Sequence, residues 1–264
     1  MKQDSKIMFV LAFVLMASLL GLALLFRACS NNPDVQYKKG LAYYHGVFVA
    51  VDKTKAAQWY QKAADQDHAN AQTNLGAMYS NGEGVPTDKS KAAQWFQKAA
   101  DQDNAIAQFN LGLIYSNGEG VPMDKSKAAQ WYQKAADQGY AFAQNNLGAM
   151  YSNGEGVPTN KSKAAQLFQM AADQDIAGAQ YNLGLMYLNG EGVPMDRSRA
   201  AQLFQKAADQ GNTSELINLA RMYARGVGFK RDINKAAILL RLAAEQGDPD
   251  APTYLENIRD NRPF

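Results

Sequence analysis

A 36-residue stretch repeats along the chain, and residues 69–104 show it in full: ANAQTNLGAMYSNGEGVPTDKSKAAQWFQKAADQDN. The next stretch, residues 105–140, reads AIAQFNLGLIYSNGEGVPMDKSKAAQWYQKAADQGY. Two more copies follow without a gap, and a diverged copy stands at each end. We number the six copies as repeats 1 to 6: 33–68, 69–104, 105–140, 141–176, 177–212 and 213–248. A sequence period of this length is typical of proteins that stack identical structural units.

Each repeat is predicted to form two helices joined by a tight turn. In repeat 2, apolar and small residues recur at helical spacing over 69–81. Gly82 is expected to end this first helix, because glycine adopts the left-handed conformation without steric cost. Asp88 is expected to start the second helix by accepting from free N–H groups of its first turn. Asp or Asn occupies this position in every repeat: Asp52, Asp88, Asp124, Asn160, Asp196 and Asp232.

The two helices of one repeat cannot bury their own apolar face, so neighbouring repeats must cover it. Ala92, Ala93 and Phe96 share one face of the second helix, and Gly76 in the first helix is expected to allow close packing. The predicted fold class is therefore all-α, a right-handed α-solenoid. Residues 249–264 are predicted to form a C-terminal capping helix.

The repeat phrase A-x-A-Q-x-N-L-G-x-M-Y-x-N-G-x-G-V-P-x-D resembles the Sel-1-like repeat, a longer relative of the tetratricopeptide repeat. The resemblance covers residues 33–248. It implies a scaffold that holds partner proteins in complexes, often at membranes or in secretory and periplasmic compartments. It implies no catalytic centre and no cofactor.

Residues 7–26 read IMFVLAFVLMASLLGLALLF, an uncharged run bracketed by Lys6 and Arg27. As a helix it would span about 30 Å, the thickness of a bilayer hydrocarbon core. A secretory signal usually has a shorter apolar stretch. We therefore predict that residues 1–28 are a retained membrane anchor, followed by an exported body on the periplasmic side of a bacterial membrane.

Two cleaved forms are alternatives to the anchor. Ala28-Cys29-Ser30 has small residues at a spacing that suits signal peptidase. Cys29 also resembles the start of a bacterial lipoprotein, although Arg27 departs from the usual motif for lipidation. The Lys and Arg residues on the two sides of residues 7–26 do not decide the orientation.

The composition limits the possible functions. Hydrophobic residues make up 47% of the chain and charged residues 20%, which excludes wholesale disorder. A net charge of +2 argues against nucleic-acid binding. One cysteine cannot form an internal disulfide, and two histidines cannot build a histidine-rich metal site.

The remaining motifs favour structural roles. The Gly-x-Gly of the NGEGVP loops follows a helix rather than a strand, so it predicts a helix–helix turn and not a phosphate site. One glutamate per repeat recurs in these loops and is expected to be solvated. His45 and His68 have no nucleophile or ligand partner at a suggestive spacing. We therefore predict no catalytic residues and no metal site.

One face of the first helices varies between repeats and is predicted to bind a partner. Its positions in repeat 2 are residues 70, 73, 77 and 80, whose spacing places them on one side of a helix. By resemblance to tetratricopeptide arrays, this face would line the concave groove. It suits an apolar or amphipathic protein segment, with a carboxylate near the arginines. The predicted groove residues are Tyr37, Leu41, Tyr44, Ile106, Phe109, Leu113, Phe142, Tyr181, Leu185, Arg221 and Arg225.

Three alternatives to this function remain at the level of sequence. The aromatic residues of the face could simply pack against neighbouring first helices. The chain could be a secreted or surface factor that binds host proteins. A β-lactam-binding or hydrolysing activity, described for cysteine-rich relatives, is disfavoured because those relatives carry a cysteine pair in each repeat.

Overall fold

A computed structural model describes residues 31–211, 213–260 and 262. The chain divides into two units. The first unit comprises residues up to 107 together with 119–122, and the second comprises 108–118 and the chain from 123 onward.

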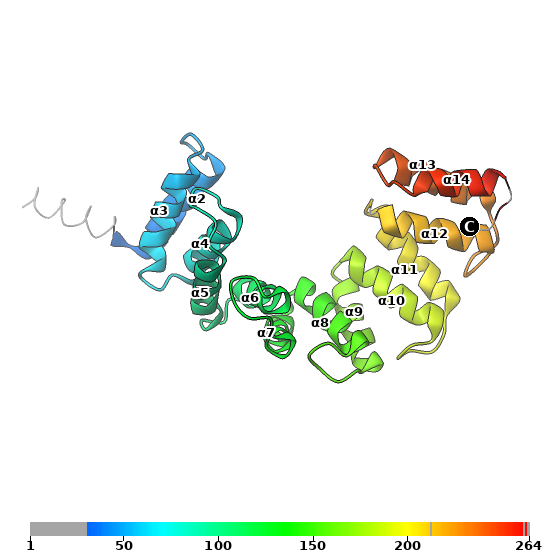
Figure 1. Cartoon of the computed structure of the whole chain (residues 1–264), viewed down its shortest axis with the longest axis horizontal. Coiled ribbons are helices and arrows are strands. Elements are labelled where there is room, and N and C mark those ends of the chain that lie inside the picture. The colour runs from blue at the N-terminus through cyan, green and yellow to red at the C-terminus, as the bar shows by residue number, and fades with distance from the viewer. Residues whose placement is uncertain (1–30, 212, 261, 263–264) are drawn as a thin grey trace, which may run out of the picture. The chain divides into compact units, whose positions relative to one another are not determined.

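Every helix of the described residues belongs to a helix pair or follows the last pair (Figure 1). In the first unit, α2 packs on α3, α3 on α4 and α4 on α5, and in the second unit α7 to α14 pack in the same sequential way. The prediction of an all-helical repeat solenoid is confirmed. The helices are α2 (Pro33–His45), α3 (Lys53–Ala64), α4 (Ala69–Asn81), α5 (Lys89–Ala100), α6 (Ala105–Asn117), α7 (Lys125–Asp137), α8 (Ala141–Asn153), α9 (Lys161–Ala172), α10 (Ala177–Asn189), α11 (Arg197–Asp209), α12 (Thr213–Arg225), α13 (Ile233–Glu245) and α14 (Ala251–Arg259).

The helix ends use the predicted caps. Asp88 accepts a hydrogen bond from the backbone N–H of Lys91 at 2.9 Å, and all six residues of this set cap in the same way. Gly82 has a φ of 72° and donates its N–H to the carbonyl of Met78 at 2.9 Å. These local signals fix where each helix begins and ends, which explains why the bounds could be predicted.

The glycine of the first helix lies against the buried ring of the second helix. A Cβ at Gly76 would come within 3.0 Å of the Phe96 ring, and one at Gly112 within 2.5 Å of the Tyr132 ring. The expected close packing is therefore confirmed. In repeat 6 the pair changes to Ala220 and Leu240, both fully buried.

The NGEGVP loop is a helix–helix turn that packs against the preceding repeat. Gly84, with a φ of 69°, lies so close to the start of α3 that a Cβ would be 2.2 Å from the carbonyl oxygen of Lys53. In the second unit, the Ser126 hydroxyl donates to the carbonyl of Gly156 at 3.1 Å. The loop glycines therefore serve the contact between repeats.

Among the residues that the structure describes, no helix is both long enough and apolar enough to cross a bilayer. The predicted membrane segment at 7–26 and the candidate lipidation site at Cys29 lie outside the described residues.

Candidate protein-interaction surface

The part of the predicted face in repeat 1 consists of Tyr37, Leu41 and Tyr44, and all three are half-buried. The Tyr37 ring stacks on the His68 ring with centroids 4.6 Å apart and also lies 5.8 Å from the Tyr60 ring. These contacts join α2 to the second helix of its own repeat and to His68, which caps the first helix of repeat 2. Packing therefore occupies much of this aromatic surface.

Tyr44 belongs to a polar group that links repeats 1 and 2. Its hydroxyl donates to Glu83 Oε2 at 2.6 Å, and Lys53 Nζ donates to the same oxygen at 2.8 Å. The hydrogen bonds from Lys53 and Tyr44 lower the pKa of the Glu83 carboxyl below its usual range. The hydrogen bond to Glu83, followed by burial, raises the pKa of the Tyr44 hydroxyl. Glu83 is thus held as a carboxylate.

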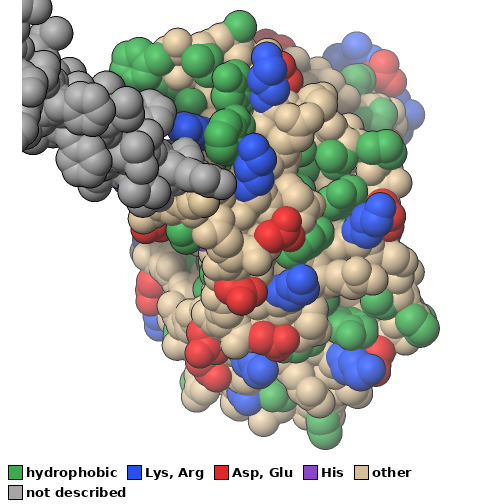
Figure 2. All heavy atoms as spheres, turned by 90° about the vertical axis from the view of Figure 1, so that its left-hand side faces the viewer, with side chains coloured by type: hydrophobic (Ala, Val, Ile, Leu, Met, Phe, Trp, Pro, Cys, Tyr) green, Lys and Arg blue, Asp and Glu red, His purple; other side chains and the backbone are tan. Residues whose placement is uncertain are grey.

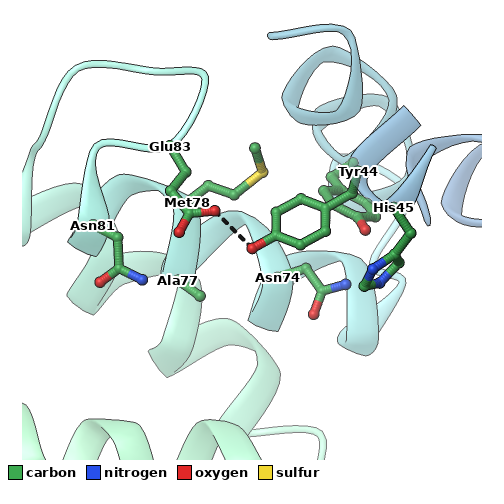
Figure 3. A pocket seen from close by; sticks show the side chains of 8 residues that line it. Tyr44, His45, Asn74, Ala77, Met78, Asn81 and Glu83 are labelled. Carbon is green, nitrogen blue, oxygen red and sulfur yellow. Dashed lines mark hydrogen bonds between the residues drawn. The ribbon is translucent and has the colours of Figure 1, made fainter. Parts of the chain in front are cut away.

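A pocket of about 260 Å³ opens beside this group (Figure 3). Figure 3 shows the Tyr44 ring crossing the pocket toward Glu83, with the side chains of Asn74 and His45 nearby. Burial raises the pKa of Tyr60, which forms part of the wall, to about 12. We name this the N-terminal pocket. Its lining residues are Tyr44, His45, Tyr60, Asn74, Ala77, Met78, Asn81 and Glu83.

A second pocket, of about 240 Å³, occupies the same place in the repeat at the junction of repeats 5 and 6. Seven of its lining residues lie 144 positions, or four repeats, after residues of the N-terminal pocket. We name it the C-terminal pocket. Its lining residues are Leu185, Leu188, Phe204, Asn218, Arg221, Met222, Arg225 and Val227.

The equivalent positions of the two pockets carry different chemistry. Leu188 replaces Tyr44, and Val227 replaces Glu83. Arg221 and Arg225 stand where the N-terminal pocket has Ala77 and Asn81. The same cavity is therefore acidic and polar at one junction, and apolar with two arginines at the other.

The C-terminal pocket brings together three of the predicted groove residues, Leu185, Arg221 and Arg225. Leu185 and Arg221 are half-buried, and Arg225 is exposed. Arg221 Nη2 donates to the hydroxyl of Tyr254 in α14 at 2.9 Å, and its guanidinium lies 5.0 Å from the centre of that ring. This contact fixes the position of Arg221 at the edge of the pocket.

The remaining candidates lie in repeats 3 to 5. Phe109 lies 5.8 Å from the Tyr132 ring and 6.2 Å from the Phe142 ring, while Phe142 itself is half exposed to solvent. Tyr181 packs on Phe204 at 5.4 Å. Leu113 is half-buried and Ile106 is exposed.

Tyr37, Phe109 and Tyr181 have the same position in their repeats and make the same contact. Each packs on the buried ring of the second helix of its own repeat. The sequence alternative, in which these aromatics pack against neighbouring first helices, holds for Phe109, whose ring also lies 6.2 Å from that of Phe142 in α8. Binding of a partner by this face stays a prediction.

Two polar sets that join repeats were not anticipated from the sequence. One is a buried glutamine in the first helix of repeats 1 to 5: Gln72 is fully buried, donates to the carbonyl of Ala64 in the preceding repeat at 3.1 Å, and accepts from Gln102 at 2.8 Å. Gln144 and Gln180 repeat both contacts. A sequence signal for this set was present: in repeats 2 to 5 the same position of the first helix holds a glutamine directly after an alanine.

The other set is an ion pair between a lysine of one repeat and the loop glutamate of the next. Lys53 and Glu83 are 2.8 Å apart, and the same pair, with its partners 30 residues apart in sequence, recurs every 36 residues. These glutamates were expected to be solvated loop residues, and the structure adds an ion pair to that role. Each is partly exposed, but each also meets a lysine that approaches from the preceding repeat.

The model of the Sel1 repeat family matches residues 33–68, 69–104, 105–140, 141–176, 177–212 and 216–248. The chain belongs to the Sel1 repeat family. Sel1 repeat proteins are generally scaffolds for interactions between proteins. The two pockets of this Sel1 repeat protein lie between the helices that form such a scaffold.

Solved structures similar to this Sel1 repeat protein come from several bacteria. The structure of c5321, a protective antigen present in uropathogenic Escherichia coli strains, is 35% identical with a TM-score of 0.82. The alignment covers 89% of this chain and 50% of c5321, so the chain spans about half the length of that relative. A Sel1 repeat protein from Oxalobacter formigenes is 33% identical with a TM-score of 0.75, over 81% of this chain and 85% of that one.

The fold extends to more distant proteins. The immunity protein PA5088 from Pseudomonas aeruginosa is 20% identical with a TM-score of 0.52, and the alignment covers 88% of each chain. This likeness bears on the fold alone. No curated protein matches the chain.

Proposed function

We propose that this Sel1 repeat protein is a non-enzymatic, membrane-tethered scaffold that holds an apolar, carboxylate-bearing segment of a partner protein in its C-terminal pocket. The observation that carries the proposal is the change of chemistry between equivalent pockets. At the junction of repeats 1 and 2, Tyr44, Glu83 and their polar neighbours hold the two repeats together. Arg221 also contacts Tyr254 of α14, and Arg225 brings a second guanidinium to the same pocket, a property that the N-terminal pocket lacks.

The C-terminal pocket suits an apolar side chain with an acidic group beside it. Leu185, Leu188 and Val227 offer apolar contact area. Guanidinium groups bind carboxylates by charge-assisted hydrogen bonds, which are stronger than neutral ones. Arg225 is exposed at this pocket and is able to meet a ligand from solvent.

The tether rests on the sequence of residues 7–26, which is long and apolar enough for one bilayer crossing. A tether confines the repeats to the membrane surface and raises their effective concentration near membrane-associated partners. We propose the periplasmic side for the repeats, in keeping with the secretory and periplasmic compartments that the resemblance to the Sel-1-like repeat implies.

Peptide selection tests the pocket. We would pan a phage-displayed library of random peptides on the full chain in nanodiscs, and measure the binding of enriched peptides by fluorescence anisotropy. We expect the enriched peptides to combine apolar and acidic residues. Arg225→Gln should weaken their binding by about tenfold, as expected for one charge-assisted hydrogen bond.

Lys235→Gln serves as the matched control, because it removes one positive charge from α13, and Lys235 does not line the pocket. Peptides that bind equally to the Arg225→Gln, Leu188→Glu and unmodified chains would show that the pocket does not bind them. The pocket proposal would then be abandoned.

Protease accessibility tests the tether and its orientation. Digestion of the repeats in spheroplasts but not in intact cells, with a full-length intact mass, is expected for a periplasm-facing anchor. Protection in spheroplasts would place the repeats in the cytoplasm. A mass that begins at Cys29 with added acyl chains would replace the anchor with a lipoprotein.

A second candidate function is that of a surface factor that meets host proteins. The likeness to c5321, a protective antigen of a pathogen, supports it. A processed form of the chain in culture supernatant would favour this candidate, whereas retention of the whole chain in the membrane fraction would count against it.

A further inference from the structure

The loop between α2 and α3 carries an apolar cluster that no part of the described chain covers. Val47, Val49 and Val51 are exposed, and Phe48 is fully exposed. Phe48 also has a φ of 60°, a conformation that residues with side chains rarely adopt. Figure 2 shows hydrophobic side chains gathered at the upper edge of this face, beside several Lys and Arg side chains.

The same loop in the next repeat has a different character. There the residues are Gly82-Glu83-Gly84-Val85-Pro86-Thr87, so Val47, Phe48 and Val51 stand in place of Glu83, Gly84 and Thr87. Gly84 is required because its loop packs on the preceding repeat. Repeat 1 follows no other repeat, which explains why a side chain is tolerated at 48. The absence of a preceding repeat does not explain why Val47, Phe48 and Val51 are all large and apolar.

The charges around the loop are mainly positive. Lys38 and Lys39 are exposed on α2, and Lys53 and Lys55 stand at the start of α3. The acidic residues over the same stretch, 33–55, are Asp34 and Asp52, and Glu83 of the next repeat pairs with Lys53, so four lysines meet three carboxylates and the net charge is +1. An apolar tip with surrounding lysines matches the interface of a bilayer that contains anionic lipid.

The distances allow the loop to reach the membrane of the proposed tether. Four residues, 27–30, separate the apolar run from the first described residue, and four extended residues span about 14 Å. The helix α2 has 13 residues and is about 20 Å long. The loop at its far end therefore reaches the headgroups when α2 lies along the bilayer.

We propose that the loop of residues 46–51 inserts Phe48 and its valine neighbours into the headgroup region of the bilayer that holds the chain. The inference rests on the proposed tether and adds a second membrane contact to it. Two contacts at opposite ends of α2 fix the direction in which the repeats leave the membrane surface.

The test places one fluorescent label on the loop and one on the equivalent loop of repeat 4. We would replace Cys29 by serine, introduce Val51→Cys or Thr159→Cys, and attach an environment-sensitive NBD dye. Both positions are exposed and hold the same place in their repeats. The full chain is reconstituted in phosphatidylcholine–phosphatidylglycerol vesicles with a lipid quencher that is spin-labelled near the headgroup.

We expect a blue-shifted, strongly quenched dye at 51 and a dye at 159 that is quenched several-fold less. Phe48→Gly, which restores the residue of the equivalent loops, should reduce the quenching at 51 toward the value at 159. Circular dichroism verifies that this variant keeps its helices.

Each other outcome overturns the inference. A dye at 51 that is not quenched, in a chain that floats with the vesicles, contradicts the loop contact and leaves the tether standing. Self-quenching that rises with the number of chains per vesicle would show that a second copy covers the loop. A blue-shifted dye without lipid quenching or self-quenching would indicate a contact with another protein surface. A chain that does not float with the vesicles contradicts both the tether and the loop contact.

Discussion

The junction of repeats 1 and 2 and the junction of repeats 5 and 6 join the same kind of unit by different chemistry. The first uses the buried amide of Gln72 and the group of Tyr44, Lys53 and Glu83. The second has Leu216 at the position of Gln72 and Val227 at the position of Glu83. The first helices have 13 residues at both junctions, so the fold accepts either a polar or an apolar junction. The side chains at a junction can therefore differ between repeats without a change of fold.

The largest expected effect comes from the loop that packs across the polar junction. Gly84→Ala should destabilise the chain by about 2–4 kcal/mol, because a Cβ would overlap the Lys53 carbonyl and the residue has a positive φ. The measurement is urea unfolding of the full chain in detergent micelles, followed by circular dichroism. Phe48→Gly, at the equivalent position without a preceding repeat, should change the midpoint little.

The second effect comes from the buried amide. Gln72→Leu should cost about 1–3 kcal/mol, because the Ala64 carbonyl and the Gln102 amide lose their partner inside the protein. The same unfolding measurement applies. An unchanged free energy of unfolding would mean that the amide contributes nothing to the junction.

The reciprocal change sharpens the comparison. Leu216→Gln places an amide at the apolar junction, where Ala208 and Gln246 hold the positions of Ala64 and Gln102. This change should lower the free energy of unfolding by at least about 1 kcal/mol less than Leu219→Gln does. Leu219 is fully buried at a position where repeats 2 to 5 also have leucine, so no partner for an amide is expected there. Equal costs would show that the last junction cannot accept the polar arrangement.

The third effect concerns Glu83 and its pH dependence. Its pKa is lower in the folded chain than its usual value of 4.5, so its contribution to stability is present above that value and is lost as the pH falls through the folded pKa. Glu83→Gln should cost no more than about 1 kcal/mol at neutral pH, because the ion pair is partly exposed. The variant's Tm should also fall less on acidification than that of the unmodified chain.

The smallest effect is expected at Glu215, which is buried in the first turn of α12. Burial raises its pKa above 4.5, so this group favours the folded state at low pH and loses that contribution as the pH rises through the folded pKa. Glu215→Gln should raise the Tm slightly at neutral pH, since the favourable helix dipole offsets part of the burial cost. A Tm difference that is constant with pH would contradict this sign.

The helices could be predicted from sequence because their signals are local. Asp88 and Gly82 determine helix ends by contacts within a few residues of themselves. The polar junctions could not be predicted as readily, because Gln72 and Glu83 meet partners in a neighbouring repeat whose orientation the sequence does not specify. The pockets depend in the same way on residues from two repeats.

The predicted binding face included residues that line a pocket, but it did not show which of its side chains are covered by packing. Leu185 and Arg221 do meet at one pocket. Tyr37 and Phe109 were chosen because their helix face varies between repeats, but rings of the second helix pack against them. The spacing of variable positions shows which residues share one side of a helix. It does not show how much of each ring is covered by a neighbouring helix.

The glutamine contacts give the array a direction that bears on how it evolves. Gln144 and Gln180 each donate to the repeat before them and accept from a glutamine just past their own second helix, so interior repeats offer the same groups at both ends. Recombination that inserts or deletes one 36-residue unit therefore creates a junction in which every amide is matched. Array length can change in whole steps among the interior copies, whereas the first and last repeats, with their own end chemistry, must be kept.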